Sequence, residues 1–360
     1  MVTIVVGGQF GDEGKGKIVS YIAQKDNPEI IARAGVGPNA GHTVYKNGKK
    51  FGLRMIPCGF VNDDSKLLIG AGVLVDTERF LEEVEITGTK GRIFIDERCT
   101  VIEQKHRDAD AGSSFLKNKI GTTGRGCGPA NADRVNRTAK LARDEPALSA
   151  YIADVPLEID KTIKAGGDVI VECSQGFGLS VYYGTYPYVT SKDTTASMAA
   201  VDIGIGPTKV DDVIIIYKAY MTRVGEGPMQ SLITDENISK YPIWAGLLEK
   251  AEKQGLPGAN ANEKIAELLG EKGTVTKRLR RVGNFDFELA KRAAMINGAT
   301  QIGVTCIDKI FPECYRKQHL EDLPKKCMDF IRLIEKKVGV SVTLISTGPE
   351  PEDIVDLRKV

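Results

Sequence analysis

The sequence lacks the features on which secreted scaffolds and structural metal sites depend. Its seven cysteines are scattered along the chain, and no two of them form a C-x-x-C pair. This pattern argues against both a disulfide framework and a zinc site. Only three histidines occur, His42, His106 and His319, so few residues are available for a histidine-based metal cluster.

Net charge and long apolar runs are also missing. Lys and Arg total 49 against 48 for Asp and Glu, so the formal net charge is +1 and the chain has no global field for a polyanion. We therefore expect no nucleic acid and no membrane among its partners. The sequence has no apolar stretch of about 20 residues and no charged leader segment at its start. These absences predict a cytoplasmic protein.

The residues that are present predict an α/β fold. Hydrophobic residues make up 42% and charged residues 27%, which is the composition of a globular protein. Short β-branched runs that end in turns predict strands at 2–6, 30–34, 66–69, 92–95, 168–172, 213–217, 301–305 and 341–345. Patterns of helical period predict helices at 14–23, 77–84, 243–254, 262–269, 285–296 and 323–337. We expect one domain over residues 1–360, with a large, mostly parallel sheet flanked by helices and ligands at the carboxyl ends of its strands.

The stretch GGQFGDEGKGK, residues 7–17, lies between the first predicted strand and the first predicted helix. A glycine-rich loop in this position is typical of phosphate binding. It is a variant of the Walker A loop, because five residues rather than four precede the Gly-Lys pair and Gly16 stands where the magnesium-binding hydroxyl belongs. We expect Lys15 and Lys17 to hold phosphate charge in a P-loop-like nucleotide-binding architecture. A glycine-rich turn without a ligand is the alternative.

Two carboxylates, Asp12 and Glu13, lie in this loop, although its backbone N–H groups should gather anions. A carboxylate about 4 Å from a phosphate charge costs roughly 4 kcal/mol at an effective dielectric constant near 20. A divalent cation between Asp12 and the phosphates would offset this repulsion and would replace the missing hydroxyl ligand. Asp12 could then also act as a base.

Two other glycine-rich loops suit phosphate chemistry. NAGHT, residues 39–43, places His42 in a loop after the second predicted strand. Beside a phosphate this histidine would be an acid or an electrostatic clamp, and otherwise it is a hydrogen-bonded loop residue. IGTTGRGCGPA, residues 120–130, combines glycines, two threonines and Arg125. That loop suits a phosphate monoester, and a structural turn is the alternative.

Two segments late in the chain carry charge. Lys277, Arg278, Arg280 and Arg281 form a basic cluster, which in most proteins is a solvated face. Here the flanking threonines and glycines favour a loop that closes on a small dianion or dicarboxylate. Asp308 follows another predicted strand and could accept hydrogen bonds from N1 and the exocyclic amine of guanine, or it could be an ordinary surface residue.

Taken together, GGQFGDEGKGK, NAGHT, GTTGRGCGPA, GTYPYVTSKDTTA, KRLRRVG and STGPE resemble the motifs of adenylosuccinate synthetases, in one order from residue 7 to residue 350. The length resembles the compact archaeal form of that family. The resemblance implies a ligase of purine biosynthesis that joins IMP to L-aspartate with GTP and Mg²⁺. The products would be adenylosuccinate, GDP and phosphate, formed through 6-phosphoryl-IMP on the way to AMP.

The resemblance also implies roles for individual residues. Asp12 would take the proton from N1 of the hypoxanthine, and His42 would stabilise or protonate the transferring phosphoryl group. Mg²⁺ would be held by Asp12 and the carbonyl of Gly41. IMP would be bound by Asp12, Glu13, Gly14, Lys15, Asn39, Ala40, Gly41, His42, Thr123, Gln175, Thr190 and Arg278, with Arg137 reaching across from the second subunit of a homodimer.

The nucleotide and aspartate sites follow by the same matching. GTP would be bound by Gly11, Asp12, Glu13, Gly14, Lys15, Gly16, Lys17, Gly41, His42, Thr43, Arg280, Cys306, Ile307, Asp308, Ser346, Thr347 and Gly348. Aspartate would be bound by Thr274, Val275, Thr276, Lys277, Arg278, Leu279 and Arg280. Cys306 stands where the family usually has a lysine, and Lys277 stands where it usually has a glycine.

Two other functions use the same phosphate-binding loop. A GTP-controlled switch would signal through loop order, but the Walker hydroxyl and the N/T-K-x-D lysine of such proteins are absent from the sequence. A different P-loop-like kinase or ligase would share the loop, but it would give no role to NAGHT or to KRLRRVG.

Overall fold

The predicted strands come together in one sheet. In the computed structural model, which describes residues 1–273 and 278–358, ten strands follow the order β16-β15-β14-β11-β1-β10-β2-β5-β7-β9. Neighbours are parallel except β15 and β16, which are antiparallel, so the mostly parallel sheet is confirmed. The strands are β1 (Val2–Gly7), β2 (Ile30–Arg33), β5 (Lys66–Ile69), β7 (Ile93–Asp96), β9 (Ile152–Ala153), β10 (Val169–Glu172), β11 (Asp212–Lys218), β14 (Gln301–Thr305), β15 (Val342–Ser346) and β16 (Ile354–Asp356).

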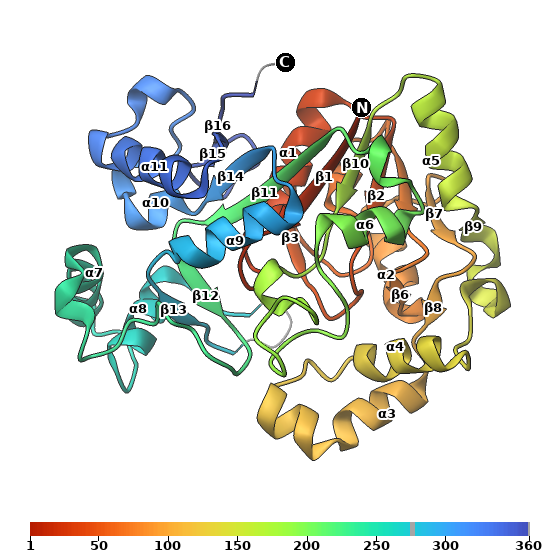
Figure 1. Ribbon diagram of the computed structural model, residues 1–360, viewed down its shortest axis with the longest axis horizontal. Helices are drawn as coiled ribbons and strands as arrows, with labels where there is room; N and C mark the ends of the chain where they lie inside the picture. Colours follow the sequence, from red (N-terminus) through yellow and green to blue (C-terminus); the bar gives the residue numbers. More distant parts are fainter. Residues whose placement is uncertain (274–277, 359–360) are drawn as a thin grey trace.

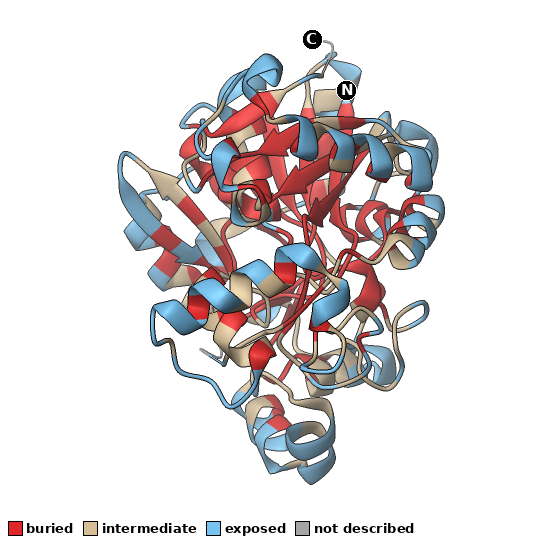
Figure 2. Cartoon of the chain, turned by 90° about the vertical axis from the view of Figure 1, so that its left-hand side faces the viewer, coloured by how far each residue is buried: buried red, intermediate tan, exposed pale blue. Residues whose placement is uncertain are grey.

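Both faces of the sheet are covered. Every residue of β1 is buried, and its side chains alternate between two apolar clusters. Ile4 and Val6 belong to one cluster, and Val5 belongs to the other. A parallel sheet needs this double cover, because its strands are apolar on both sides. Figure 2 shows the buried strands between helices whose outer surfaces are exposed.

Helices supply that cover. The first cluster takes residues from α5, α6, α9 and α11, and the second takes residues from α1 and α2. Figure 1 shows α6 and α9 crossing in front of the sheet. The six predicted helices are confirmed, and the set is α1 (Lys15–Asp26), α2 (Thr77–Thr87), α3 (Gln104–Gly112), α4 (Cys127–Asn136), α5 (Val155–Lys164), α6 (Ala196–Ile203), α7 (Pro242–Lys253), α8 (Ala261–Leu269), α9 (Phe287–Asn297), α10 (Ile307–Ile310) and α11 (Lys325–Val338).

Three small sheets were not predicted, and one of them corrects the placement of His42. A hairpin joins β3 (His42–Lys46) to β4 (Lys49–Leu53), so His42 begins a strand rather than lying within a loop. Asn47 and Gly48 form its tip with φ of 51° and 73°, as an Asn-Gly hairpin turn requires. The other pairs are β6 (Leu74–Val75) with β8 (Thr100–Val101) and β12 (Met221–Arg223) with β13 (Arg281–Gly283).

Within residues 1–273 and 278–358, no helix combines the length and the apolar character that crossing a bilayer would require.

Candidate active site

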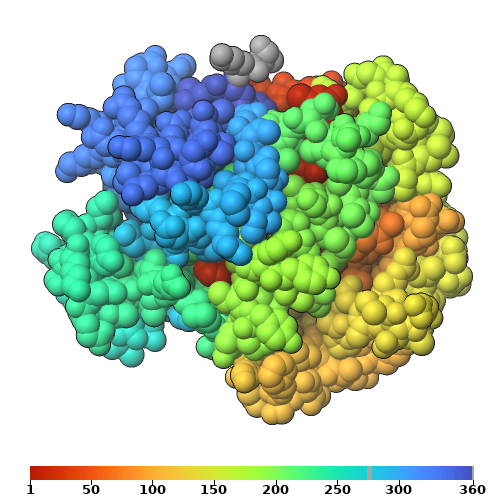
Figure 3. Space-filling model, viewed as in Figure 1, coloured from red at the N-terminus to blue at the C-terminus, as the bar shows by residue number. Residues whose placement is uncertain are grey.

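A cavity of about 670 Å³ opens at the carboxyl ends of the central strands, where the fold predicts ligand binding. Its walls come from the loops after β1, β2, β10 and β12, from residues between 110 and 128, and from residues 272, 273 and 280. Figure 3 shows N-terminal residues, coloured red, at the base of a gap between segments from the middle and the last third of the chain. The predicted residues that line the cavity are Gly11, Asp12, Gly14, Lys15, Gly16, Asn39, Ala40, Gly41, His42, Thr43, Thr123, Gln175, Thr190 and Arg280.

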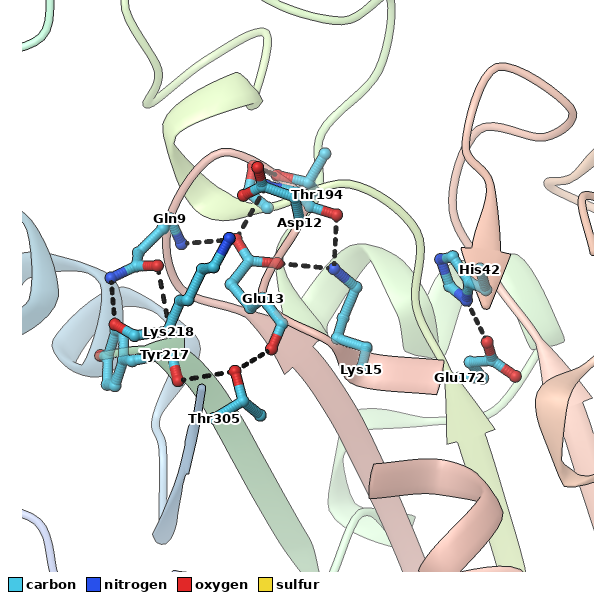
Figure 4. A network of polar contacts seen from close by, with 12 residues as sticks. Gln9, Asp12, Glu13, Lys15, His42, Glu172, Thr194, Tyr217, Lys218 and Thr305 are labelled. Carbon is cyan, nitrogen blue, oxygen red and sulfur yellow. Dashed lines mark hydrogen bonds and ion pairs between the residues drawn. The ribbon is translucent and has the colours of Figure 1, made fainter. Parts of the chain in front are cut away.

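Glu13 holds the glycine-rich loop together from inside. Its fully buried side chain accepts hydrogen bonds at Oε1 from the backbone N–H of Gln9 (2.9 Å) and of Gly11 (2.8 Å). Its Oε2 lies 2.7 Å from the ammonium of Lys15 (Figure 4). Its carbonyl accepts a hydrogen bond of 2.6 Å from the Thr305 hydroxyl. Glu13 therefore has only its backbone N–H left for a ligand.

Asp12, in contrast, faces the cavity, and 9% of its side chain is exposed. Its Oδ2 accepts a hydrogen bond from the hydroxyl of Thr222 and lies 3.1 Å from Arg280 Nε. Its Oδ1 is buried and has no hydrogen-bond partner among the described residues. Burying a carboxylate oxygen without a partner is costly, so this atom is poised for a ligand group.

His42 lies beyond Lys15 from Asp12, and its ring faces the carboxylate of Glu172 (Figure 4). Its Nδ1 contacts Oε1 of Glu172, and Arg33 Nη1 lies 2.6 Å from the same oxygen. The other oxygen of Glu172 accepts a hydrogen bond of 2.5 Å from the backbone N–H of Cys58. An ionised carboxylate only accepts hydrogen bonds, so we assign the proton of the neutral His42 ring to Nδ1, which faces Glu172. The lone pair of the ring is then on Nε2, a buried atom that has no partner among the described residues.

Burial and charge set the protonation of this group. Burial first, and then the guanidinium of Arg33, lower the pKa of His42 to about 4. Burial alone would raise the pKa of Glu172, but Arg33 and His42 outweigh it and lower that pKa to about 2. At neutral pH the free protein therefore holds a neutral imidazole against an ionised carboxylate.

The same group has the spacing of a metal site. Ligand atoms of His42, Cys58 and Glu172 lie within 4.8 Å of one another. However, Arg33 Nη1 lies 2.7 Å from His42 Nδ1 and 2.6 Å from Glu172 Oε1. A permanent cation therefore already fills this space, and the cluster orients His42 rather than binding a metal.

Lys17 ties the start of α1 to the loop after β15. Its ammonium donates hydrogen bonds to Ser346 Oγ (2.8 Å) and to the carbonyls of Gly348 (2.5 Å) and Asp353 (2.9 Å). Burial lowers its pKa to about 8, against the opposing effect of Asp353 and other acidic neighbours. Asp308, in α10, is another of those neighbours, so α1, α10 and the loop after β15 come together at Lys17.

Not every predicted residue lines the cavity. Arg137 is exposed at the end of α4, with φ of 65°. Arg278 lies beside the cavity. Its Nη1 would be 3.8 Å from a Cβ atom added to Gly121, and Gly121 lines the cavity. Thr274, Val275, Thr276 and Lys277 lie outside the described residues. The others that are not part of the lining are Glu13, Lys17, Leu279, Cys306, Ile307, Asp308, Ser346, Thr347 and Gly348.

Comparison with known proteins decides the family. The family model described as adenylosuccinate synthetase matches residues 4–145 and 139–314. The chain belongs to this family. It is 55% identical over 359 residues to the adenylosuccinate synthetase of Methanosphaera stadtmanae and 56% identical over 357 residues to that of Archaeoglobus fulgidus. Each match covers 99% of this chain and 98% of the relative, so the resemblance to the compact archaeal form is confirmed.

A solved structure agrees on the fold. The fully ligated adenylosuccinate synthetase from Plasmodium falciparum superposes with a TM-score of 0.84 at 24% identity, covering 99% of this chain and all of that chain.

Adenylosuccinate synthetases are ligases that join IMP and L-aspartate with GTP in AMP biosynthesis, the activity that the motifs predicted. The switch and the unrelated kinase are thereby set aside.

Four residues beside this site are not predicted from the sequence. Arg33, Glu172 and Lys218 are the last residues of β2, β10 and β11, and all three are buried. Thr222, which contacts Asp12, is buried in β12. The sequence does carry a signal for the first three, because each is a charged residue at the end of an apolar strand. A buried charge needs a partner, and these strands end at the carboxyl edge of the sheet, where ligands bind.

Proposed function

We propose that ligation begins with Asp12 as general base. Its Oδ1 would take the proton from N1 of the hypoxanthine, so that O6 attacks the γ-phosphate of GTP and forms 6-phosphoryl-IMP with release of GDP. The amine of L-aspartate would then attack C6 and expel phosphate. The observation that carries this proposal is the buried Oδ1 of Asp12, which lies in the wall of the cavity and has no partner within residues 1–273 and 278–358.

His42 would serve the phosphoryl group. Its Nε2 is buried and has no partner in the part of the chain that the structure describes, and Glu172 fixes the ring from the other side. The negative charge of a bound triphosphate favours the protonated imidazole, so His42 would donate a hydrogen bond to the phosphoryl oxygens as they gain charge. Arg33 would hold Glu172 in place through this change.

The residues present fit a magnesium ion. Mg²⁺ prefers oxygen ligands and usually adds one or two carboxylates to substrate phosphates. Asp12 and Gly41 line the same cavity, so Oδ2 of Asp12 and the carbonyl of Gly41 would hold the ion, and Oδ1 would stay free to take the proton. When bound, the ion would neutralise phosphate charge beside Asp12. This neutralisation would explain why a phosphate-binding loop contains a carboxylate.

The substrates would be distributed along the cavity. IMP would contact Asn39, Gln175, Thr190 and Thr123, since Gln175 Nε2 already donates a 3.0 Å hydrogen bond to Asn39 and the other two line the same wall. The guanine would lie near Asp308 and the loop at 346–348, which meet at Lys17. L-aspartate would be held by the arginines at 278 and 280.

We also propose that Arg137 acts on IMP from the second subunit of a homodimer. Within its own chain this residue is exposed and does not line the cavity. An exposed arginine with a left-handed backbone at the end of α4 could instead complete the site of a partner.

A coupled assay tests the proposed function. The protein is incubated with IMP, L-aspartate, GTP and Mg²⁺, and adenylosuccinate and phosphate are measured together. We expect equal amounts of both products, and no turnover when any one component is left out. Phosphate release that does not depend on IMP would contradict the proposal.

A further inference from the structure

A buried hydrogen-bonded chain ends on the carboxylate of Asp12. The hydroxyl of Thr222 contacts Asp12 Oδ2, and Lys218 Nζ donates to the same hydroxyl at 3.2 Å. Lys218 Nζ also lies 2.5 Å from Glu271 Oε1, and Tyr220 donates to that oxygen. Thr222 is fully buried and Lys218 is 2% exposed, so water does not reach this chain of contacts.

The direction of each hydrogen bond follows from the chemistry of the groups. An ammonium only donates, so the oxygen of Thr222 accepts from Lys218. Its single proton is then left for Asp12 Oδ2. Burial lowers the pKa of Lys218, but the carboxylates of Glu271 and Asp12 outweigh it and raise that pKa above its usual value. Lys218 therefore remains a donor at any working pH.

Arg280 does not duplicate this hydrogen bond. Its Nε lies 3.1 Å from Asp12 Oδ2, but that N–H has no acceptor in hydrogen-bond geometry among the described residues. Arg280 Nη1 donates instead to Glu271 Oε2 at 2.8 Å. Thr222 lies in β12, which is paired with β13. Its hydroxyl therefore makes the directed hydrogen bond that fixes the Asp12 carboxylate.

We infer that Thr222 is a positioning residue, which holds Asp12 Oδ2 so that Oδ1 alone faces the substrate. This inference rests on the proposed function, in which Asp12 is the base. Without the hydroxyl, the carboxylate could rotate and present either oxygen, or neither, to N1 of the hypoxanthine. A misplacement of about 1 Å can cost roughly 100-fold in rate.

The test compares Thr222→Val, which keeps the shape but removes the hydroxyl, with Thr222→Ser, which keeps the hydroxyl. We expect Thr222→Val to lower kcat about 10- to 100-fold with KM values within about twofold of the parent protein, because the lost contact matters mainly in the transition state. Thr222→Ser should restore kcat to within about threefold. Calorimetric binding of IMP should be unchanged in both.

Two results would overturn the inference. One is a Thr222→Val protein with parental kcat, and the other is equal impairment of the Val and Ser variants, which would assign Thr222 to packing. Should Thr222→Val fail to fold, Thr222→Ala gives the same comparison with Thr222→Ser. Asp12→Asn is measured in parallel. An active Asp12→Asn protein removes the base assignment itself, whereas an inactive one beside a fully active Thr222→Val protein removes only the role of Thr222.

Discussion

The ammonium of Lys15 and the carboxylate of Glu13 form an ion pair of 2.7 Å within the glycine-rich loop, and their side chains are 1% and 0% exposed. The pair gives the two carboxylates of this loop separate tasks. Glu13 fixes the backbone of the loop, and Asp12 is left facing the cavity.

Replacing Glu13 should therefore destabilise the fold. Glu13→Gln leaves the Lys15 ammonium buried without its counter-charge, and breaking a buried pair in this way costs about 3 to 5 kcal/mol. We expect a loss of that size in the free energy of unfolding, measured by urea denaturation. Glu82→Gln is the matched control, because Glu82 forms an ion pair with Arg79 at the surface. The side chain of Arg79 is 36% exposed and that of Glu82 is 60% exposed. That control should lose at most about 0.5 kcal/mol, and equal losses in the two variants would refute the internal role of Glu13.

Stability should fall as the solution is acidified, in two windows. The unfolded chain protonates His42 below pH 6.5, but the folded chain does so only near pH 4, so stability decreases between these values. Glu172 adds stability above about pH 4.5 that is lost as pH falls towards 2. The first window should amount to about 3 to 4 kcal/mol at most in the free energy of unfolding, measured by urea denaturation at several pH values. His42→Gln should flatten it, and an unchanged slope in that variant would contradict the buried neutral imidazole.

Asp308→Asn should change the choice of nucleotide. The carboxylate is proposed to accept from N1 and the exocyclic amine of guanine, whereas the amide of Asn offers one donor and one acceptor. We expect kcat/KM for GTP to fall by about 100-fold, and xanthosine triphosphate to become the better substrate. The measurement compares the two nucleotides at saturating IMP and aspartate. Parental preference for GTP in the variant would place the guanine elsewhere.

Mixing two inactive variants tests the shared site. Arg137→Leu and Asp12→Asn each should abolish most activity alone. After denaturation and refolding together, random pairing makes half of the dimers hybrids, and each hybrid has one site with both native residues. Activity should return to about a quarter of the parental level. If the mixture stays inactive while it forms dimers, Arg137 acts within its own chain or not at all.

The sheet and its main helices could be predicted because they depend on local patterns. In the run Ile214–Ile216, Ile215 packs on one face of the sheet and its two neighbours pack on the other. A parallel strand that is buried on both sides needs such a continuous run of apolar residues. The hairpin that begins at His42 is not predicted because its strands, HTVYK and KKFGL, are short and rich in polar residues, although Asn47 and Gly48 carry a turn signal.

The candidate site was predictable only in part. The glycine-rich loops are recognisable in sequence because glycine at positive φ, such as Gly14 at 80°, allows the backbone to approach a phosphate. The partners of Asp12 and His42 are far from them in sequence, since Thr222 is 210 residues from Asp12 and Glu172 is 130 residues from His42. They come together because β11, which precedes β12 in the chain, pairs with β1, and because β10 pairs with β2.

The most direct test of the central claim follows an oxygen label in GTP. GTP carrying ¹⁸O in the bridge between its β- and γ-phosphates is incubated with IMP and Mg²⁺ but without aspartate. Reversible transfer of the γ-phosphoryl group to IMP lets the label move to the non-bridging β-positions. We predict that the parental protein moves the label only when IMP is present, and that Asp12→Asn binds both nucleotides but moves it about 10²- to 10⁴-fold more slowly. Label movement at the parental rate in Asp12→Asn would contradict the assignment of Asp12 as the base.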